Sequence, residues 1–152
     1  MPHIEFLTPI GPVILREEAG FLVSLDWGRS DRDEPTDLLR ESARQIAAYF
    51  NRERRTFTLP LNPRGTVFQS RVWAALLTIP YGSTETYGHI ARSLGFGVRG
   101  AGARAVGGAC GRNPLPILIP CHRVISSNGT LGGYSGPETV KPFLLSLESS
   151  QP

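Results

Sequence analysis

The segment from Asn113 to Gly136, NPLPILIPCHRVISSNGTLGGYSG, constrains this chain more than any other. Its apolar run, Leu115 to Ile119, leads through a proline into Cys121, His122 and Arg123. A cysteine attacks as its thiolate, and a neighbouring imidazole and guanidinium can supply a base and a positive field. The pattern therefore predicts a positioned nucleophile, while a purely structural cysteine–histidine pair fits the same residues.

The residues around this pair predict its local geometry. Adjacent side chains on an extended strand point to opposite sides, so His122 is expected to reach Cys121 through a bent backbone or a water. A catalytic base also needs a group to orient it, and Glu148 is the best candidate. Asn128–Gly129 then indicates a two-residue hairpin, which would resemble the wing of a winged helix.

The second half of the chain is predicted to be mostly helical. Hydrophobic spacing and turn signals place four helices, at residues 68–79, 86–95, 101–111 and 139–148. The second and third of these, joined by a glycine-rich connection, suggest a helix-turn-helix. The helix over 101–111, AGARAVGGACG, carries only small side chains besides Arg104 and Val106. Such a helix permits close approach to a partner, and close packing against a neighbouring strand remains the alternative.

The first half is predicted to be a small α/β scaffold. Strand-like runs cover Pro12 to Arg16 and Phe21 to Trp27, with a hairpin turn at Gly20, and Arg55 to Leu61 is expected to form a third strand. The periodicity from Leu38 to Phe50 predicts a helix packed on the hairpin. The fold class is therefore α+β, with domains at residues 1–62 and 63–152.

Charge is distributed unevenly along the chain. Residues 1–60 carry eight arginines against ten acidic residues, whereas residues 61–152 carry seven arginines and one lysine against three acidic residues. A basic second half suggests a polyanionic partner, although an arginine-rich composition alone would give the same surplus. Two cysteines and three histidines lack zinc-ligand spacing, so no metal is expected. The N-terminus lacks a secretory signal and no segment is long enough to span a membrane, so a cytoplasmic protein is expected.

The segment ARAVGGACGRNPLPILIPCHRVISSNGTLGGYSG resembles the active-site region of the O6-alkylguanine-DNA alkyltransferases, whose Pro-Cys-His-Arg-Val motif carries the alkyl-accepting cysteine. The similarity extends upstream through Phe68 to Ala91 and downstream to Lys141, Leu144, Leu145 and Glu148. The first half resembles the family only in size and in its strand–helix layout. The motif is long and specific, so the resemblance covers essentially the whole second domain.

The resemblance implies a role for each matching residue of the reaction centre. Cys121 would attack the alkyl carbon on the exocyclic oxygen of guanine, and His122, oriented by Glu148 and bridged by water, would take the thiol proton. Tyr87 would donate a hydrogen bond to the ring nitrogen that gains charge. Asn113 would brace the turn and the strand that carries Cys121.

The same resemblance implies the DNA contacts. Arg104 would project from the recognition helix and fill the space left by the extruded nucleotide, because a base must leave the stack before a protein can react with it. Backbone groups near Val124 would read the base. The pocket would be lined by Pro116, Tyr134 and Ser135. Phosphates would be contacted by Ser127 and Gln69.

The implied function is irreversible, single-turnover transfer of the alkyl group from O6-alkylguanine, with O4-alkylthymine as a further candidate lesion. No cofactor is expected, and the partner is duplex DNA bound by a monomer, on the nucleoid within the cytoplasm. Three alternatives stay open: a damage sensor that binds without transfer, a winged-helix regulator and a cysteine hydrolase.

Three departures from the family pattern accompany the resemblance. The connection from Leu94 to Arg104 is longer than usual, which leaves the helix-turn-helix geometry open. The first half lacks the zinc ligands of some members. No preceding regulatory domain with a second acceptor cysteine is present, which argues against a transcriptional regulator.

Overall fold

The computed structural model describes residues 1–96, 101–132, 134 and 136–149. The chain divides into two compact units, Met1–Arg64 and Gly65–Pro152. The boundary expected from the sequence, between residues 62 and 63, falls in the same NPRG segment.

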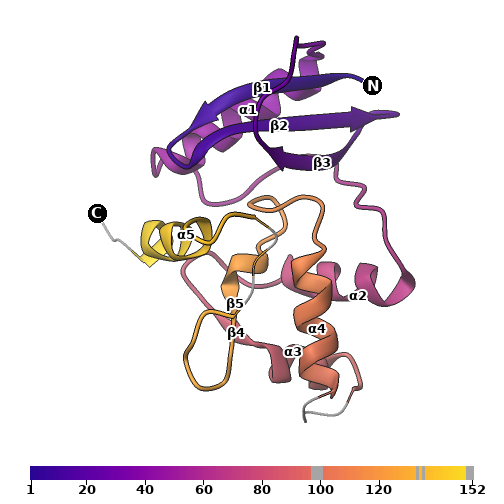
Figure 1. Cartoon of the computed structure of the whole chain (residues 1–152), viewed down its shortest axis with the longest axis vertical. Helices are drawn as coiled ribbons and strands as arrows, with labels where there is room; N and C mark the ends of the chain where they lie inside the picture. Colours follow the sequence, from indigo (N-terminus) through magenta and orange to yellow (C-terminus); the bar gives the residue numbers. More distant parts are fainter. Residues whose placement is uncertain (97–100, 133, 135, 150–152) are drawn as a thin grey trace. The chain divides into compact units, whose positions relative to one another are not determined.

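Unit 1 contains an antiparallel three-stranded sheet in the order β1-β2-β3 (Figure 1). The elements of this unit are β1 (His3–Thr8), β2 (Gly11–Glu18), β3 (Phe21–Trp27) and α1 (Asp37–Phe50). The predicted hairpin is confirmed, with a register shift at Arg16/Glu17. The third strand is not the predicted one: it is β1, whose residues pair with β2 from His3↔Arg16 to Thr8↔Gly11.

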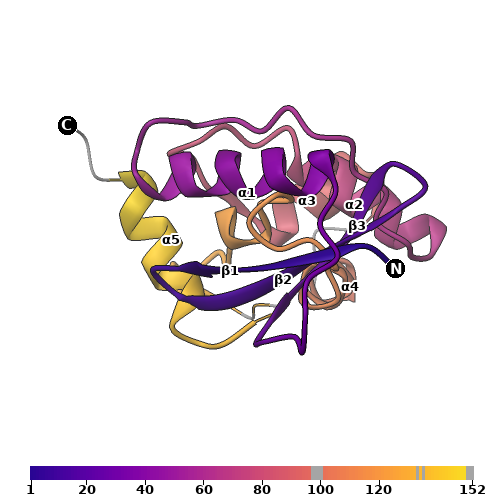
Figure 2. The same cartoon turned by 90° about the horizontal axis from the view of Figure 1, so that it is seen from above.

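Helix α1 covers one face of this sheet, as the view from above shows (Figure 2). It begins after Thr36, whose side chain accepts a hydrogen bond from the Leu39 amide and so satisfies one of the free donors of the first turn. Leu39, Ile46 and Tyr49 lie on its buried face. The helix predicted from Leu38 to Phe50 is therefore confirmed, and its amphipathic spacing explains its orientation.

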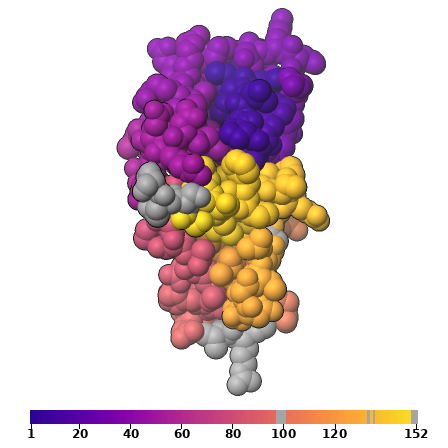
Figure 3. All heavy atoms as spheres, turned by 90° about the vertical axis from the view of Figure 1, so that its left-hand side faces the viewer, coloured from indigo at the N-terminus to yellow at the C-terminus, as the bar shows by residue number. Residues whose placement is uncertain are grey.

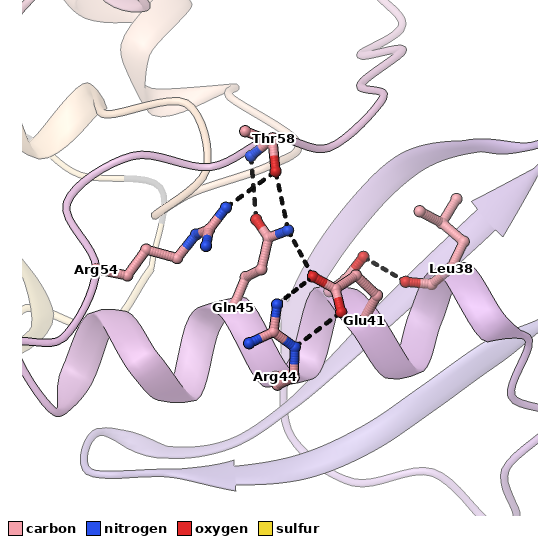
Figure 4. Close-up of polar contacts among 7 residues, drawn as sticks. Leu38, Glu41, Arg44, Gln45, Arg54 and Thr58 are labelled. Atoms are coloured by element: carbon pink, nitrogen blue, oxygen red, sulfur yellow. Dashed lines mark hydrogen bonds and ion pairs between the residues drawn. The ribbon is translucent and has the colours of Figure 1, made fainter.

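The predicted strand from Arg55 to Leu61 is wrong except at its end, where Leu61 forms a parallel bridge with Leu22. The preceding segment is held by the buried side chain of Gln45 on α1 (Figure 4). The Gln45 amide oxygen accepts from the Thr58 amide at 3.0 Å, and its nitrogen donates to the Thr58 hydroxyl at 3.1 Å. A side chain thus replaces the ladder partner that the alternating sequence suggested.

Unit 2 is mostly helical, and its elements follow in the order α2 (Val67–Leu76), β4 (Glu85–Thr86), α3 (Tyr87–Ser93), α4 (Ala101–Gly111), the 3₁₀ helix η1 (Cys121–Arg123), β5 (Val124–Ile125) and α5 (Val140–Ser149). The four predicted helices are confirmed, with ends shifted by a few residues. Helix α4 packs on α2 and α3. The indole Nε1 of Trp73 on α2 donates to the Ala109 carbonyl on α4 at 2.9 Å, which fixes that contact.

The predicted wing has its chain reversal but neither the predicted turn nor the strands. The chain reverses between Ser126 and Thr130, where the Ser126 amide donates to the Thr130 carbonyl at 2.9 Å. The predicted two-residue turn is not the one formed: the Gly129 amide donates to the Ser126 carbonyl at 2.9 Å, and Gly129, with a φ of 87°, is the third residue of the turn. Within the described residues, however, the strand before the turn, β5, pairs in parallel with β4. Figure 3 shows the segment that contains β5 (orange) beside α5 (yellow). Of the described helices, none is long and apolar enough to cross a membrane.

Candidate active site and DNA-binding face

Cys121 is the first residue of η1 and is only 1% exposed. The expected strand before it is absent: residues 112–120 form turns, and the Ile119 amide donates to the Leu115 carbonyl at 2.9 Å. Ile117 in this segment has a φ of 76°, a strained value for a β-branched residue. The prolines at 114, 116 and 120 lack amide donors, so this apolar segment cannot form a regular strand. The bent backbone expected at Cys121 is therefore present as a 3₁₀ turn.

Asn113 closes this irregular segment. Its buried amide nitrogen donates to the Ile119 carbonyl at 2.9 Å, and its side-chain oxygen accepts from the Leu115 amide at 2.9 Å. Both bonds are made to the backbone, so they fix the path of the chain that leads to Cys121. The predicted bracing contact is present, although it braces a turn and not a strand.

His122 is fully buried, and its Nε2 lies 2.6 Å from Oε2 of Glu148. A carboxylate only accepts hydrogen bonds, so we assign the proton to Nε2, which leaves Nδ1 with a lone pair in the neutral ring. Nδ1 has no hydrogen-bond partner among the described residues. Burial, the largest effect, lowers the pKa of His122, against the opposing effect of Glu148. The ring is therefore a neutral, oriented base.

Glu148 also binds Arg123, which the sequence suggested only as a source of positive field. Arg123 Nε lies 2.8 Å from Oε1 of Glu148 and its Nη2 lies 3.0 Å from Oε2, while Nη1 donates to the Ile79 carbonyl at 2.7 Å. The forked contact is the strong, planar arrangement of an arginine–carboxylate pair. Arg123 thus holds Glu148 in place for His122.

Lys141 is a site residue to which sequence reasoning gave no role. It is 2% exposed, and its Nζ donates to the Val124 carbonyl at 2.6 Å and to the Tyr87 hydroxyl at 3.2 Å. Burial lowers the pKa of Lys141, and negative charge on Cys121 acts in the opposite direction. This interaction is mutual, so the ammonium favours the thiolate. One signal was available: Lys141 is the chain's single lysine, seven residues before Glu148 on the buried face of α5.

Tyr87 begins α3 and is buried against the loop after β5. A Cβ atom on Gly132 would lie 2.5 Å from the Tyr87 hydroxyl oxygen, so only glycine, with its φ of 73°, allows this approach. Tyr134 lies on the same loop. Its hydroxyl is buried without a hydrogen-bond partner among the described residues, and burial raises its pKa. That hydroxyl therefore stays protonated and able to donate.

A cavity of about 430 Å³ adjoins these groups and is lined by residues of the loop and of α5. Tyr134 and Lys141 contribute to its wall. Its volume is within the range of small-molecule pockets. Pro116 is buried and, like Cys121, is not among the residues that line this cavity, so its expected place in a base pocket stays a prediction. Ser135 lies outside the described residues.

Two further residues with an expected DNA contact, Val124 and Gln69, make hydrogen bonds within the protein. The Val124 carbonyl, expected to read a base, accepts from Lys141, and its amide donates to the Cys121 carbonyl. Gln69, expected at a phosphate, forms the capping box of α2: its side chain accepts from the Thr66 amide at 2.9 Å while the Thr66 hydroxyl accepts from the Gln69 amide. The sequence pattern T-x-x-Q was the available signal for this cap.

Helix α4 presents Arg104 to solvent. It packs mainly on the helices α2 and α3, and three of its glycines are not required by packing. A Cβ at Gly108 or Gly111 would meet nothing within 4 Å, and one at Gly107 would make ordinary contact with Tyr87. Each glycine weakens a helix by roughly 1 kcal/mol relative to alanine. Packing therefore does not explain Gly107, Gly108 and Gly111, and close approach of α4 to a partner stays a prediction.

Ser127 lines a pocket beside α4, and its expected phosphate contact stays a prediction. With Ser126, His89 and Arg92 it lines a polar pocket that also includes Ala103 of α4. Hydroxyl groups and an arginine are typical phosphate ligands. Within the described ranges, no group of three or more His, Cys, Asp or Glu side chains could hold a metal ion.

A buried thiol next to an imidazole–carboxylate pair is typical of a protein that uses cysteine as a nucleophile, and the packed helices α3 and α4, with the small-residue helix α4 partly exposed, fit a helix-turn-helix unit. Two family models match the chain: "6-O-methylguanine DNA methyltransferase, ribonuclease-like domain" over residues 6–63, and the "DNA binding domain" of the same family over residues 67–150. The chain therefore belongs to the 6-O-methylguanine DNA methyltransferase family.

Relatives match along nearly the full chain. It is 44% identical to the methylated-DNA--protein-cysteine methyltransferase of Methanosarcina acetivorans over 99% of each chain. It is 43% identical to the constitutive enzyme of Bacillus subtilis, over 93% of this chain and 91% of that one. The fold matches a crystal structure of the Mycobacterium tuberculosis enzyme in complex with DNA, with a TM-score of 0.87 and 41% identity over 98% of this chain and 93% of that chain.

Proposed function

We propose that this protein repairs DNA by moving the alkyl group of O6-alkylguanine irreversibly onto Sγ of Cys121. The observation that carries the proposal is the hydrogen bond between two buried groups, Nε2 of His122 and Oε2 of Glu148, at 2.6 Å. His122 is the residue that directly follows Cys121. Unit 2 would hold both the acceptor and the DNA-binding face, with unit 1 as scaffold. We expect a monomer that acts in the cytoplasm on chromosomal duplex DNA, with O4-alkylthymine as a further candidate lesion.

The transfer is a single displacement. A bond forms between Sγ and the alkyl carbon as the bond from that carbon to the guanine oxygen breaks. The thiol proton goes to Nδ1 of His122, through a bridging water, and Tyr87 donates a proton to the leaving base. Lys141, 3.2 Å from the Tyr87 oxygen, would stabilise the phenolate that develops there. The thioether product has no leaving route, so one molecule repairs one lesion and needs no cofactor.

The extruded base would enter the cavity beside Tyr134 and Lys141. The Tyr134 hydroxyl has no partner among the described residues, which supports this assignment, because a buried donor without a partner is costly unless a ligand satisfies it. The second lone pair of the Val124 carbonyl is available to the base. The loop residue Ser135 and Pro116 remain expected pocket residues.

The DNA contacts would centre on α4. Its small side chains suit insertion into a groove, and the exposed Arg104 would occupy the stack when the nucleotide leaves. Phosphates of the lesion strand would bind at the polar pocket of Ser127 and Arg92. Gln69 is less suited to a phosphate because its side chain already caps α2.

Transfer is favoured over the alternative of a sensor that only binds damage, because Cys121 is present and the full-length relatives are named methyltransferases. The test is the intact mass of the protein after incubation with a duplex that contains O6-methylguanine. We expect one added methyl group, mapped to Cys121, and no further adduct with excess duplex. Tight binding with an unchanged mass would support the sensor instead.

Acidification should destabilise the protein through His122. Its folded pKa is lowered from 6.5, so below that pH the unfolded chain binds more protons, and the free energy of unfolding should fall as the pH falls from about 7 to about 5.5. Glu41, whose pKa is lowered to about 2 by its hydrogen bond with Arg44, stays ionised over this range. Urea unfolding should show a smaller pH dependence in His122→Gln than in the wild type. Equal pH dependence would contradict the assignment.

A further inference from the structure

The exposed face of α4 lies between two cavities of opposite character. On one side is the polar pocket, which includes Ala103, Arg92 and Ser127. On the other is an apolar cavity of about 390 Å³, lined by Phe68 of α2, Phe96, and Ala101, Gly102 and Ala105 of α4. The proposed function uses the polar pocket and leaves the aromatic cavity without a role.

Phe96 is held rigidly although it lies just beyond the end of α3. Its amide donates to the Ala91 carbonyl at 2.8 Å and the Gly95 amide donates to the Arg92 carbonyl at 3.0 Å, while Gly95 has a φ of 88°. This is the Schellman pattern that ends a helix on a glycine. The backbone of Phe96 is therefore fixed by α3.

The Phe96 ring is fixed from a second direction. It packs edge-on against Phe68, with ring centroids 5.1 Å apart at 80°, and the Arg71 guanidinium lies 5.5 Å from its centroid. Arg71 also donates to the Leu94 carbonyl at 2.8 Å. Even so, Phe96 remains 38% exposed. A large ring positioned by these contacts and left partly in water is a preformed apolar surface.

The charges around this surface indicate which kind of partner binds there. Arg71 is exposed and lies beside the Phe96 ring, Arg92 lines the polar pocket on the other side, and Arg104 is exposed on α4. In the described part of unit 2, Glu148 is buried with Arg123 and Glu85 pairs with His89. The third acidic residue, Glu138, is exposed and lines the cavity beside Tyr134, not the aromatic cavity. A second copy of the chain docked through this same face would bring arginines against arginines. Duplex DNA instead offers apolar deoxyribose edges alternating with phosphates, which match a phenyl ring beside a guanidinium.

We infer that Phe96 and Phe68, with the adjacent α4 residues Ala101, Gly102 and Ala105, form a second DNA contact that packs against the deoxyribose edge of the strand opposite the lesion strand. The inference rests on the proposed function, because α4 must lie in a groove. The polar pocket and the aromatic cavity would then contact the two strands on either side of Arg104. Arg71 would meet a phosphate of the strand that Phe96 contacts.

The test compares Phe96→Ala with Phe143→Ala, which removes an equally exposed ring (39%) from α5. Duplex affinity is measured by fluorescence anisotropy over a range of salt, and the reaction with free O6-benzylguanine reports on the thiol site. We expect Phe96→Ala to weaken duplex binding by about tenfold with an unchanged salt slope, because no charge is removed. Phe96→Leu should restore most of the affinity, Phe143→Ala should change nothing, and Arg71→Gln should lower the salt slope by about one.

Unchanged duplex affinity in Phe96→Ala, or an equal loss in its reaction with the free base, would overturn the inference. The inference would also be overturned if analytical ultracentrifugation showed that the wild-type protein self-associates and that Phe96→Ala abolishes this self-association without weakening duplex binding. These outcomes are distinct from failure of the proposed function, which would leave the wild-type protein without an adduct on methylated duplex.

Discussion

Cys121→Ser is expected to slow alkyl transfer by at least about a thousandfold and to leave no adduct on the protein. A serine hydroxyl does not ionise near neutral pH, so His122 and Lys141 would have no thiolate to form or stabilise. Duplex affinity should remain nearly unchanged, because α4 and the arginines around it are untouched. The intact mass and the anisotropy of a labelled duplex measure the two quantities separately.

Cys110→Ala is the matched control for that prediction. Cys110 is also buried, and burial raises the pKa of its thiol to about 12, so it stays protonated and unreactive. This variant should still accept one alkyl group, on Cys121. An adduct that persists in Cys121→Ser but disappears in Cys110→Ala would show that the acceptor has been assigned to the wrong thiol.

Glu148→Ala is expected to have the second large effect, on stability and on rate together. It leaves the buried Arg123 guanidinium with the Ile79 carbonyl and the Tyr81 ring as neighbours but without its carboxylate, and it removes the partner of His122 Nε2. Removal of one partner from a buried ion pair costs about 3–5 kcal/mol. The rate should also fall by about a hundredfold or more, because a misoriented imidazole is a poor base.

Glu148→Gln separates the two effects. The amide keeps the size and one acceptor oxygen, so the free energy of unfolding should fall by less than in the alanine variant, while alkyl transfer stays slow. Glu53→Gln, which removes one exposed charge from unit 1, should change neither quantity. Urea unfolding and the rate of adduct formation provide the measurements. A glutamine variant with the wild-type rate would exclude a role for Glu148 in orienting His122.

Much of this protein follows from local sequence. The periodicity from Leu38 to Phe50 and the small-residue run from Ala101 to Gly111 predict helices that the structure contains, because helical spacing is a property of residues three and four apart. Asn128–Gly129 predicts a chain reversal in the same way, although not the type of turn that forms. The order Pro-Cys-His-Arg identifies the candidate thiol and its base before any coordinates are known.

Tertiary structure decided the rest. An alternating segment becomes a strand only where it pairs with a neighbour along its length: β1 pairs with β2 over six residues, whereas Arg55 to Leu61 meets β3 only at Leu61 and is held at Thr58 by Gln45 of α1. The alternation is similar in both, so local pattern could not distinguish them.

The site depends on contacts between distant parts of the chain. His122 and Arg123 reach Glu148 across 26 and 25 residues, and Lys141 reaches Tyr87 across 54. Such pairs leave no periodic signal, because the packing of η1, α3 and α5 brings them together. The sequence by itself therefore determined which residue is the candidate acceptor. Only the tertiary structure decided which buried charges surround it, since a charge is stable there only where the fold supplies its partner.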